Sequence, residues 1–361
     1  MAIVFNADNR FYYSKLNTAE KRLYKFMADC LINNQYKFIY INEFDTVPVN
    51  NDLPMFVYKI DEFIIASKVW TSLIMDCPEF YYVEEYDFIL DDNVALMGKE
   101  NPYYTQTEIE EINKALDDIY HNFDHLNDEY EIELAVNDYI INNYQYDYET
   151  TDYYIDENDW MFDINLWRRS REKFNVVGLI KYKKGVCSAF THLAQYIFQR
   201  KGLNVINIKG ELPADDIGHR WLLIKLDNEY YSLDITYNLY LANDIKMPQY
   251  MFFNSTYDVS KKYHFPLDTE VSDLLKNSKG IKYNYYHKNN LFFYDLDNLY
   301  EALKNNLDKD NTLRFDFNVD YNIINDDVKK IVKKALKKYD ISKYYLSNKD
   351  NYYALTYKGD E

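Results

Sequence analysis

The fold is decided by "GVCSAFTHLAQYIFQRKG", residues 185–202. Its apolar residues recur at intervals of three and four, which predicts an amphipathic helix with one buried face. Gly202 stands where a helix C-terminal cap is usual, and Gly185 permits a tight turn into the helix. The helix is therefore expected to begin at or just after Cys187. Its buried stripe is predicted to be Phe190, Leu193, Ala194, Ile197 and Phe198.

A cysteine at the start of a helix lies among backbone N–H groups that have no acceptor within the helix. These groups and the helix dipole favour the thiolate, and they lower a cysteine pKa from about 8.5 toward neutrality. For a single cysteine, a buried structural role is nevertheless the commoner explanation. Cys187 is interpreted as a nucleophile only if another part of the chain supplies a proton carrier.

Residues 218–238, "GHRWLLIKLDNEYYSLDITYN", are interpreted as two strands joined at the turn pair Asp227 and Asn228. A two-residue loop pairs Leu226 with Glu229. The alternating pattern then gives one mostly apolar face and one face that collects the polar groups. The polar face is predicted to hold His219, Trp221, Leu223, Lys225, Tyr230, Ser232, Asp234 and Thr236.

On that face His219 lies opposite Thr236, and Asp234 lies opposite Trp221. His219 and Asp234 become diagonal neighbours, about 7 to 8 Å apart at the backbone, which allows a carboxylate to bind an imidazole N–H. Such a contact fixes the imidazole tautomer and steadies the imidazolium, as the third member of a catalytic triad does. A loop of odd length would separate the two side chains. The remaining histidines lack this support: His121, His125, His192, His264 and His287.

The composition narrows the possible partners. The 361 residues include 41 Lys plus Arg and 59 Asp plus Glu, a formal net charge of −18, which disfavours nucleic acid and anionic membranes. The length is sufficient for two or three domains, and a hydrophobic content of 47% is sufficient for their packed cores. Many of the 40 tyrosines lie among Asn, Asp and Lys, and the high tyrosine content is interpreted as compositional bias. The expected partner is a protein or peptide substrate, and the oligomeric state is left open.

The three cysteines, Cys30, Cys77 and Cys187, are few and widely spaced, which argues against a disulfide framework and a Cys-rich zinc site. Cys30 falls on an apolar helical stripe, and no ionisable pattern is recognised around Cys77. No metal or other cofactor is expected, and no calcium-binding loop is recognised. The chain shows no export signal or membrane span, so the expectation is a cytoplasmic protein, or a secreted or cell-surface one if a signal has been removed.

Three regions are predicted: residues 1–125, 126–262 and 263–361. In the first, Asn17 with Glu20 caps one helix, and Thr107 with Glu110 is predicted to form a capping box for another. The run "EFYYV", residues 79–83, is predicted to be a strand. Residues 148–174 are interpreted as a long loop or inserted helix. The last region is predicted to be a small α+β module with helix 296–307, strand 313–319, a helix with a lysine-rich exposed face from residue 326, and strand 351–357.

These motifs resemble a known family. "GVCSAF" at 185–190, "GHRW" at 218–221 and "YYSLDITYN" at 230–238 are similar to the Cys, His and Asp motifs of the transglutaminase-like superfamily, whose fold is related to papain-like cysteine proteases. "VNDYIINNYQYD" and "VVGLIKYKKGVC" resemble the segments before the nucleophile. "LNTAEKRLYKFM" and "DCPEFYYV" resemble the N-terminal region of bacterial, especially clostridial, members. The resemblance implies an α+β fold, with the nucleophile helix packed on an antiparallel sheet in region 126–262.

The resemblance also implies roles for single residues. Cys187 is the expected nucleophile, His219 the general base and acid, and Asp234 its orienting partner. Members of the family often have glycine two positions after the nucleophile and asparagine after His-x-Trp, whereas Ala189 and Leu222 stand here. An upstream aromatic residue usually supplies an oxyanion donor. The candidates for the oxyanion hole and substrate groove are Tyr146, Tyr182 and Trp221.

The expected activity is that of a thiol hydrolase or acyltransferase that acts on amide bonds through an acyl-thioester. Water as acceptor gives proteolysis or deamidation, a lysine amine gives crosslinking, and hydrolysis is slightly favoured. One alternative is a noncatalytic binding module on the same fold. A second, an arylamine-type acetyltransferase that uses coenzyme A, is disfavoured because no basic site for its phosphates lies near the motifs.

Overall fold

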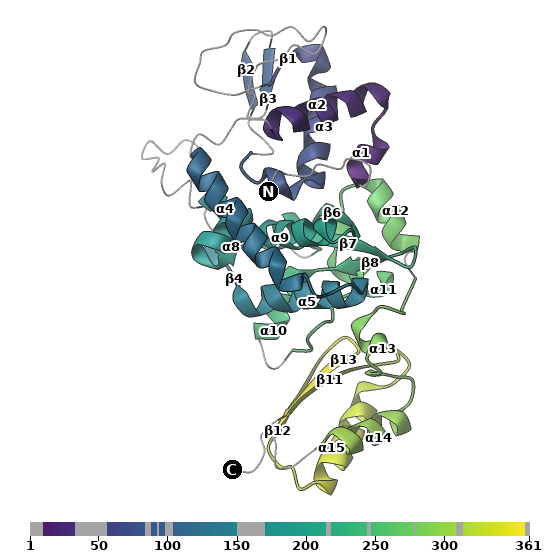
Figure 1. Cartoon of the computed structure of the whole chain (residues 1–361). Helices are drawn as coiled ribbons and strands as arrows, with labels where there is room; N and C mark the ends of the chain where they lie inside the picture. Colours follow the sequence, from purple (N-terminus) through teal and green to yellow (C-terminus); the bar gives the residue numbers. More distant parts are fainter. Residues whose placement is uncertain are drawn as a thin grey trace. The chain divides into compact units, whose positions relative to one another are not determined.

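The structure is a computed structural model that describes residues 10–32, 56–83, 88–91, 94–97, 104–149, 170–213, 218–243, 247–277, 279–307 and 313–357 (Figure 1). The chain divides into two compact units. Unit 1 comprises Met1–Val136 and Asp147–Ile208, and unit 2 comprises Asn137–Tyr146 and Lys209–Glu361. Cys187 therefore belongs to unit 1, whereas His219 and Asp234 belong to unit 2. The three sequence regions stay a prediction.

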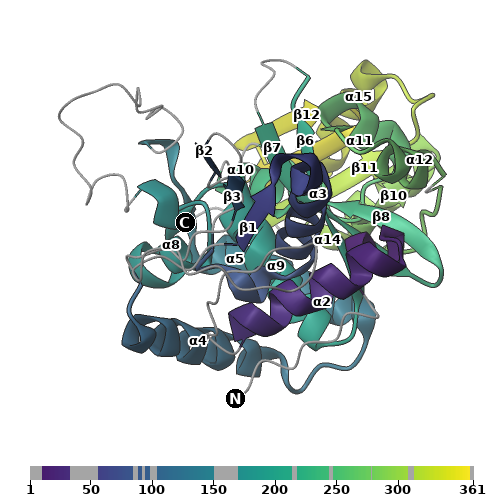
Figure 2. The same cartoon turned by 90° about the horizontal axis from the view of Figure 1, so that it is seen from above.

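Helices dominate the described part of unit 1. Helix α3 packs against α1 and α2, and Figures 1 and 2 both show α2 alongside α3. Strands β1, β3 and β2 pair in that order in a small antiparallel sheet. The helical elements are α1 (Phe11–Lys15), α2 (Thr18–Ile32), α3 (Ile60–Asp76), η2 (Pro78–Phe80), α4 (Gln106–Tyr120), η3 (His121–Phe123), α5 (Glu129–Asn143, which ends in unit 2), α8 (Val176–Tyr182) and α9 (Cys187–Arg200); the strands are β1 (Phe56–Lys59), β2 (Phe88–Asp91), β3 (Val94–Met97) and β5 (Lys184–Gly185).

The first predicted helix cap is confirmed, and the second lies two residues earlier than predicted. Asn17 and Glu20 bond reciprocally: the Asn17 side chain accepts from the Glu20 N–H at 3.0 Å, and the Glu20 carboxylate accepts from the Asn17 N–H at 2.8 Å. The capping box of α4 is formed by Thr105 and Glu108. The predicted pair, Thr107 with Glu110, is wrong because Thr105 has the same spacing to an acid and starts the helix earlier, which places Thr107 inside the first turn.

The predicted strand 79–83 is also wrong. Pro78 occupies the first position of the short helix η2, where its fixed φ and missing N–H are tolerated. Turn hydrogen bonds follow, from the Phe80 N–H to the Cys77 carbonyl and from the Val83 N–H to the Phe80 carbonyl, both at 3.1 Å. The aromatic run is buried in a turn, so its apolar character reflects the core and not a sheet. Residues 150–169 of the predicted loop 148–174, and the side chain of Cys30, lie outside the described residues.

Helix α9 agrees closely with the prediction. It begins at Cys187 and ends at Arg200, and Gly202 follows with a positive φ of 84°. A Cβ on Gly185 would lie 2.7 Å from the Ala189 Cβ and 2.8 Å from Leu179 Cδ2. Gly185 is therefore required by close packing of α8 and β5 against α9. The predicted stripe of Phe190, Leu193, Ala194, Ile197 and Phe198 is fully buried.

Unit 2 contains a four-stranded sheet of order β8-β7-β6-β9, in which strand β6 begins in unit 1. The hairpin β7–β8 has the predicted register, with Leu226 opposite Glu229 and Leu222 opposite Leu233. Asp227 and Asn228 have φ of 47° and 66°, as a two-residue type I′ turn requires. The bounds are β6 (Asn204–Glu211), β7 (Gly218–Leu226), β8 (Glu229–Leu233) and β9 (Phe265–Pro266).

The second hairpin strand is shorter than predicted. Strand β8 ends at Leu233, and helix α10 (Ile235–Asn243) begins two residues later, so the predicted pairing of His219 with Thr236 is wrong. Asp234 is the residue at the change of direction. Its side chain accepts from the Tyr237 N–H at 3.0 Å, which is the bond of a helix N-cap, and its carbonyl accepts from the Asn238 N–H at 3.0 Å.

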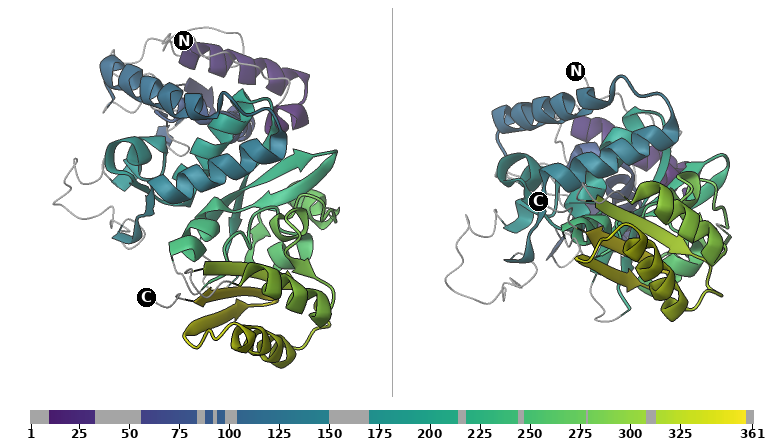
Figure 3. Two further views of the ribbon diagram at one scale, coloured as in Figure 1. Left: turned by 60° about the horizontal axis from the view of Figure 1, so that its bottom comes forward. Right: turned by 90° about the horizontal axis from the view of Figure 1, so that it is seen from below.

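The C-terminal part of unit 2 has its own core. Its sheet has the order β10-β11-β13-β12, and helices α14 and α15 cover one face (Figure 3). The predicted α+β elements are confirmed, whereas strands β10 and β12 were not predicted. The remaining elements of unit 2 are β4 (Gln145–Tyr146), α11 (Tyr257–Tyr263), α12 (Thr269–Asn277), α13 (Tyr285–Lys288), β10 (Phe292–Phe293), α14 (Leu296–Asn306), β11 (Leu313–Val319), α15 (Asn325–Lys338), β12 (Tyr344–Lys349) and β13 (Tyr352–Tyr357).

Candidate active site

Cys187 is the first residue of α9, and it is half-buried. The preceding N-cap residue, Val186, has no side-chain acceptor, and no acidic residue occupies the first turn of the helix. The positive end of the helix is therefore not neutralised by its own residues, which favours a thiolate at Cys187. The Val186 N–H donates to the Lys173 carbonyl at 2.9 Å, and the Ser188 hydroxyl donates to the Phe174 carbonyl at 2.6 Å. These bonds hold the start of α9 in place.

Cys77 offers a contrast within the same unit. It is 1% exposed, its sulfur lies 3.3 Å from the Tyr24 hydroxyl, and burial raises the pKa of its thiol well above the usual value. Ionisable groups do surround it, since Glu79, Arg10 and Asp76 all act on its titration. The sequence interpretation of its surroundings is therefore wrong. A buried thiol of this kind is chemically inert.

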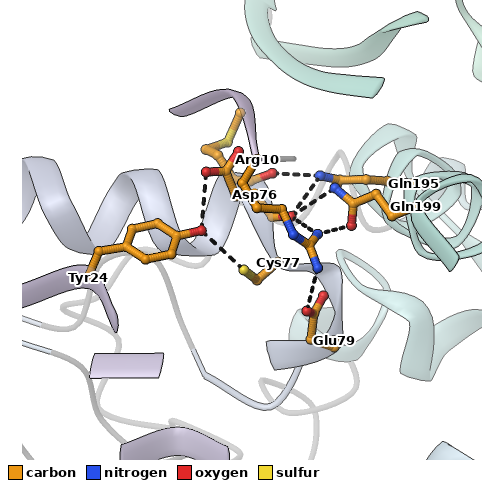
Figure 4. Close-up of polar contacts among 8 residues, drawn as sticks. Arg10, Tyr24, Asp76, Cys77, Glu79, Gln195 and Gln199 are labelled. Atoms are coloured by element: carbon orange, nitrogen blue, oxygen red, sulfur yellow. Dashed lines mark hydrogen bonds and ion pairs between the residues drawn. The ribbon is translucent and has the colours of Figure 1, made fainter. Parts of the chain in front are cut away.

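The groups around Cys77 belong to a polar cluster that reaches α9 (Figure 4). The Arg10 guanidinium donates to the Glu79 carboxylate at 2.8 Å, to the backbone carbonyl of Asp76 and to the side chain of Gln199. Gln195 donates to the Met75 carbonyl at 2.8 Å. Both glutamines lie on α9, so the N-terminal helices fix the body of the helix that begins at Cys187.

The predicted contact between His219 and Asp234 is confirmed. His219 Nε2 lies 2.7 Å from Asp234 Oδ2, and the two side chains are 7% and 1% exposed. The backbone N–H of Asp234 donates to the Phe252 carbonyl at 3.0 Å. Because the carboxylate accepts at Nε2, proton exchange with a nucleophile falls to Nδ1, the other ring nitrogen of His219.

A second imidazole, missed from the sequence, completes this cluster. His264 Nε2 lies 2.8 Å from the same Asp234 Oδ2. His264 is the residue directly after α11 and is fully buried. Its position depends on how α11 packs beside the hairpin, and local sequence gives no signal of that contact. The contact between His264 and Asp234 is therefore evident only from the structure.

The cluster sets the charge of Asp234. Burial alone would raise the pKa of this carboxyl, but the opposing charge and hydrogen bond of His219, helped by His264, hold it well below the usual value. Burial lowers the pKa of His264, and the bond to Asp234 only partly opposes that effect. Asp234 is thus a permanent carboxylate at neutral pH, and His264 is a neutral donor to it.

Trp221, a predicted groove residue, is only 1% exposed. Its ring centroid lies 4.7 Å from that of His264 and 5.9 Å from that of His219. A Cβ on Gly210 would collide with the indole. Trp221 therefore packs behind the imidazoles and offers almost no surface to a substrate.

The two tyrosine candidates for the oxyanion hole lie in different units. Tyr146 ends the short strand β4 in unit 2 and is half-buried. Tyr182 ends α8 in unit 1, is 37% exposed and donates its hydroxyl to the Glu172 carboxylate at 2.5 Å. That bond already occupies the Tyr182 hydroxyl proton.

The three polar side chains also resemble a metal-ligand set. His219, Asp234 and His264 present ligand atoms that all lie within 4.8 Å of one another. A zinc ion would need to lie about 2.0–2.2 Å from each of them. Here the carboxylate oxygen itself accepts the bonds of both imidazoles at 2.7 and 2.8 Å. The observed geometry is that of a hydrogen-bonded cluster.

The comparisons with known proteins include a match to a protein family. Residues 114–263, which include Cys187, His219 and Asp234, match a family model described as a transglutaminase-like domain. This segment belongs to the transglutaminase-like family. The two positions where the sequence departs from the family pattern, Ala189 and Leu222, are 0% and 1% exposed, so both side chains lie in the core.

Two solved structures are also similar to part of this chain. One, described as a TGase, has 14% identity and a TM-score of 0.29, with 42% of this chain and 43% of that chain covered. The other, described as a "Putative Cysteine Protease from Cytophaga hutchinsonii", has 14% identity and a TM-score of 0.24, with 40% of this chain and 52% of that chain covered. Both TM-scores are low, so the family assignment rests on the match at 114–263. No curated protein matches the chain.

Within the described residues, no helix combines the length and apolar character that crossing a bilayer requires.

Proposed function

We propose that this transglutaminase-like protein is a thiol enzyme that acts on amide bonds of a protein or peptide, with Cys187 as nucleophile, His219 as general base and acid, and Asp234 as the orienting carboxylate. The single observation that carries the proposal is the buried bond of 2.7 Å between His219 and Asp234, on the hairpin where the family pattern expects it. The start of α9 at Cys187 supports it. The proposal requires Cys187 and His219 to share one cleft.

The chemistry follows from these groups. The Cys187 thiolate attacks the amide carbonyl carbon, and the C–N bond breaks as the His219 imidazolium gives its proton to the departing amine. An acyl-thioester remains. Water then attacks the thioester, with His219 accepting its proton, and releases a carboxylic acid and the thiolate. A lysine amine in place of water gives a crosslink, and we favour hydrolysis. Tyr146 is the proposed side-chain oxyanion donor beside the Cys187 N–H.

The test is the rate of Cys187 alkylation by iodoacetamide as a function of pH, with the modified residue identified by mass. We expect reaction well below pH 8 in the natural protein and a loss of that reactivity in His219→Ala. Cys77 is the internal control, because its buried thiol should not react in the folded protein. Reaction of Cys187 only above pH 8 would instead support a noncatalytic binding module.

The substrate class is tested separately. The protein is incubated with a mixed peptide library, and the acyl-enzyme is trapped by acid quench and identified by mass. A glutamyl adduct indicates deamidation or crosslinking, and a peptidyl adduct indicates proteolysis. Cys187→Ala is the matched control and should form neither adduct.

A further inference from the structure

We propose that His264 is a positioning residue of the catalytic centre: it shares the Asp234 carboxylate oxygen with His219 and thereby fixes the orientation and basicity of the His219 imidazole. The inference rests on the proposed function and extends it to a residue outside the Cys-His-Asp triad. His264 itself is not proposed to touch the substrate.

The hydrogen bonds of Asp234 define the arrangement. Oδ1 accepts from the Tyr237 N–H at 3.0 Å, while Oδ2 accepts from both His219 at 2.7 Å and His264 at 2.8 Å. An ionised carboxylate only accepts hydrogen bonds, so each imidazole must carry its proton on Nε2. Asp234 is thus held at both oxygens, and rotation of the carboxylate would break a bond at each end.

His264 is well placed to act as a fixed donor. Its backbone N–H donates to the Ser260 carbonyl at 2.9 Å, and its Nδ1 lies 3.4 Å from the Ser260 hydroxyl. Its ring packs on Trp221 and beside Phe252, with centroids 4.7 and 5.8 Å away. The side chain has no exposed surface, so it has little freedom to leave Asp234.

The shared oxygen has an electrostatic consequence. A second N–H bond spreads the negative charge of Asp234, which reduces the stabilisation that the carboxylate gives to the His219 imidazolium. Burial keeps His264 neutral at neutral pH, because its pKa is lowered. His264 should therefore lower the pH at which the His219 imidazolium loses its proton. In an enzyme that works as a thiolate–imidazolium pair, the rate declines above that pH, so it sets the basic limb of the pH–rate profile.

Other charged groups lie near this part of unit 2. The Lys349 ammonium lies 4.7 Å from the ring centroid of Tyr263 and 6.0 Å from that of Tyr237. Asp350 accepts from the Tyr263 hydroxyl at 2.9 Å and lies 3.3 Å from the Lys262 ammonium. These groups stay unchanged in variants of His264, so differences between such variants report on the imidazole itself.

Three variants test the proposal. His264→Gln keeps an N–H donor near the position of Nε2, His264→Leu removes it, and His264→Asn places its amide too close to the backbone to reach Asp234. We expect His264→Leu and His264→Asn to lower kcat about 10- to 100-fold with little change in KM, the loss typical of one hydrogen bond to a charged group. His264→Gln should restore most of the rate.

Imidazole titration by NMR gives a readout that does not depend on catalysis. We expect the titration midpoint of His219 to move to higher pH in His264→Leu and His264→Asn. The basic limb of the pH profile of Cys187 alkylation should move in the same direction. His264→Gln should titrate close to the natural protein. A purely structural role would lower Tm in all three variants without moving the His219 midpoint, and that result would overturn the proposal.

The two proposals can fail separately. Natural protein whose Cys187 reacts only above pH 8 contradicts the proposed function, whatever the variants do. Natural protein with an activated Cys187, together with an unchanged His219 midpoint in His264→Leu and His264→Asn, contradicts only the role of His264. If the leucine variant fails to fold, the asparagine variant makes the same comparison.

Discussion

Asp234 joins two functions in one side chain: it binds His219 through Oδ2 and caps helix α10 through Oδ1. The helix that begins after Asp234 therefore fixes the carboxylate that orients the imidazole. Replacement of this residue should affect activity and stability by different routes.

Asp234→Asn should nearly abolish activity while the protein stays folded. An asparagine side chain still caps a helix, but its single carbonyl oxygen cannot serve both Tyr237 and the two imidazoles, and its NH₂ group faces donors. In a Cys-His-Asp centre we expect kcat to fall by a factor on the order of 10⁴, as for the same change in a serine triad. Kinetics and the Tm are measured together.

Asp234→Ala is the contrasting variant, because it removes the cap as well. Its Tm should lie clearly below that of Asp234→Asn, since loss of an N-cap costs about 1 kcal/mol. Equal Tm values would contradict the assigned capping role, and full activity of Asp234→Asn would contradict the catalytic one.

The glycine behind Trp221 should tolerate no side chain. A Cβ on Gly210 would collide with the Trp221 indole and the Phe265 carbonyl. Gly210→Ala must therefore displace the ring that packs on His264, and we expect a loss of about 1–3 kcal/mol in the free energy of unfolding. Denaturant unfolding measures it.

Gly218→Ala is the matched control, because a Cβ on Gly218 meets no atom within 4 Å. We expect this substitution to change the free energy of unfolding by less than about 0.5 kcal/mol. Similar losses in the two variants would mean that the indole does not define the space around His264.

A chelator should leave the activity unchanged. His219, Asp234 and His264 pair directly at hydrogen-bond distances, and the proposed chemistry takes its proton transfers from the imidazole. Incubation with EDTA, followed by an assay of peptide turnover, checks this. Loss of activity on chelation with recovery on added zinc would reassign the cluster as a metal site.

Part of the candidate site could be predicted from the sequence alone. The turn at Asp227 and Asn228 is decided by neighbouring residues, so its register could be predicted, and with it the approach of His219 to Asp234. The end of β8 at Leu233 could not be predicted, because the hydrogen bonds by which Asp234 caps α10 compete with strand pairing. The predicted contact forms even though the strand pairing beyond Leu233 does not.

Contacts between segments that are distant in the sequence could not be predicted. His264 reaches Asp234 only because α11 packs beside the hairpin, and such packing leaves no periodic pattern. The prediction of a strand at 79–83 was wrong for a related reason: the apolar residues of this run are buried in a turn after Pro78, and their sequence pattern does not distinguish such a turn from a strand. Helix α9, by contrast, was predictable at both ends because its stripe and Gly202 are local signals.

The buried carboxyl of Asp76 should make stability depend on pH in a defined direction. Burial raises its pKa to about 7, although the Tyr13 and Tyr12 N–H groups and Arg10 oppose that rise. In the unfolded chain the same carboxyl loses its proton near pH 4. At Asp76 the folded state therefore binds a proton more tightly between these values, and the contribution of this carboxyl to the free energy of unfolding falls as pH rises from about 4 to about 7.

Asp76→Asn isolates this effect, because asparagine resembles the neutral acid and does not titrate. The free energy of unfolding of the natural protein, minus that of Asp76→Asn, should fall by about 1.4 kcal/mol for each pH unit over which only the folded state keeps the proton. Denaturant unfolding at several pH values between 4 and 8 measures the difference. A difference that rises with pH would mean that Arg10 and the backbone donors outweigh burial and keep Asp76 ionised.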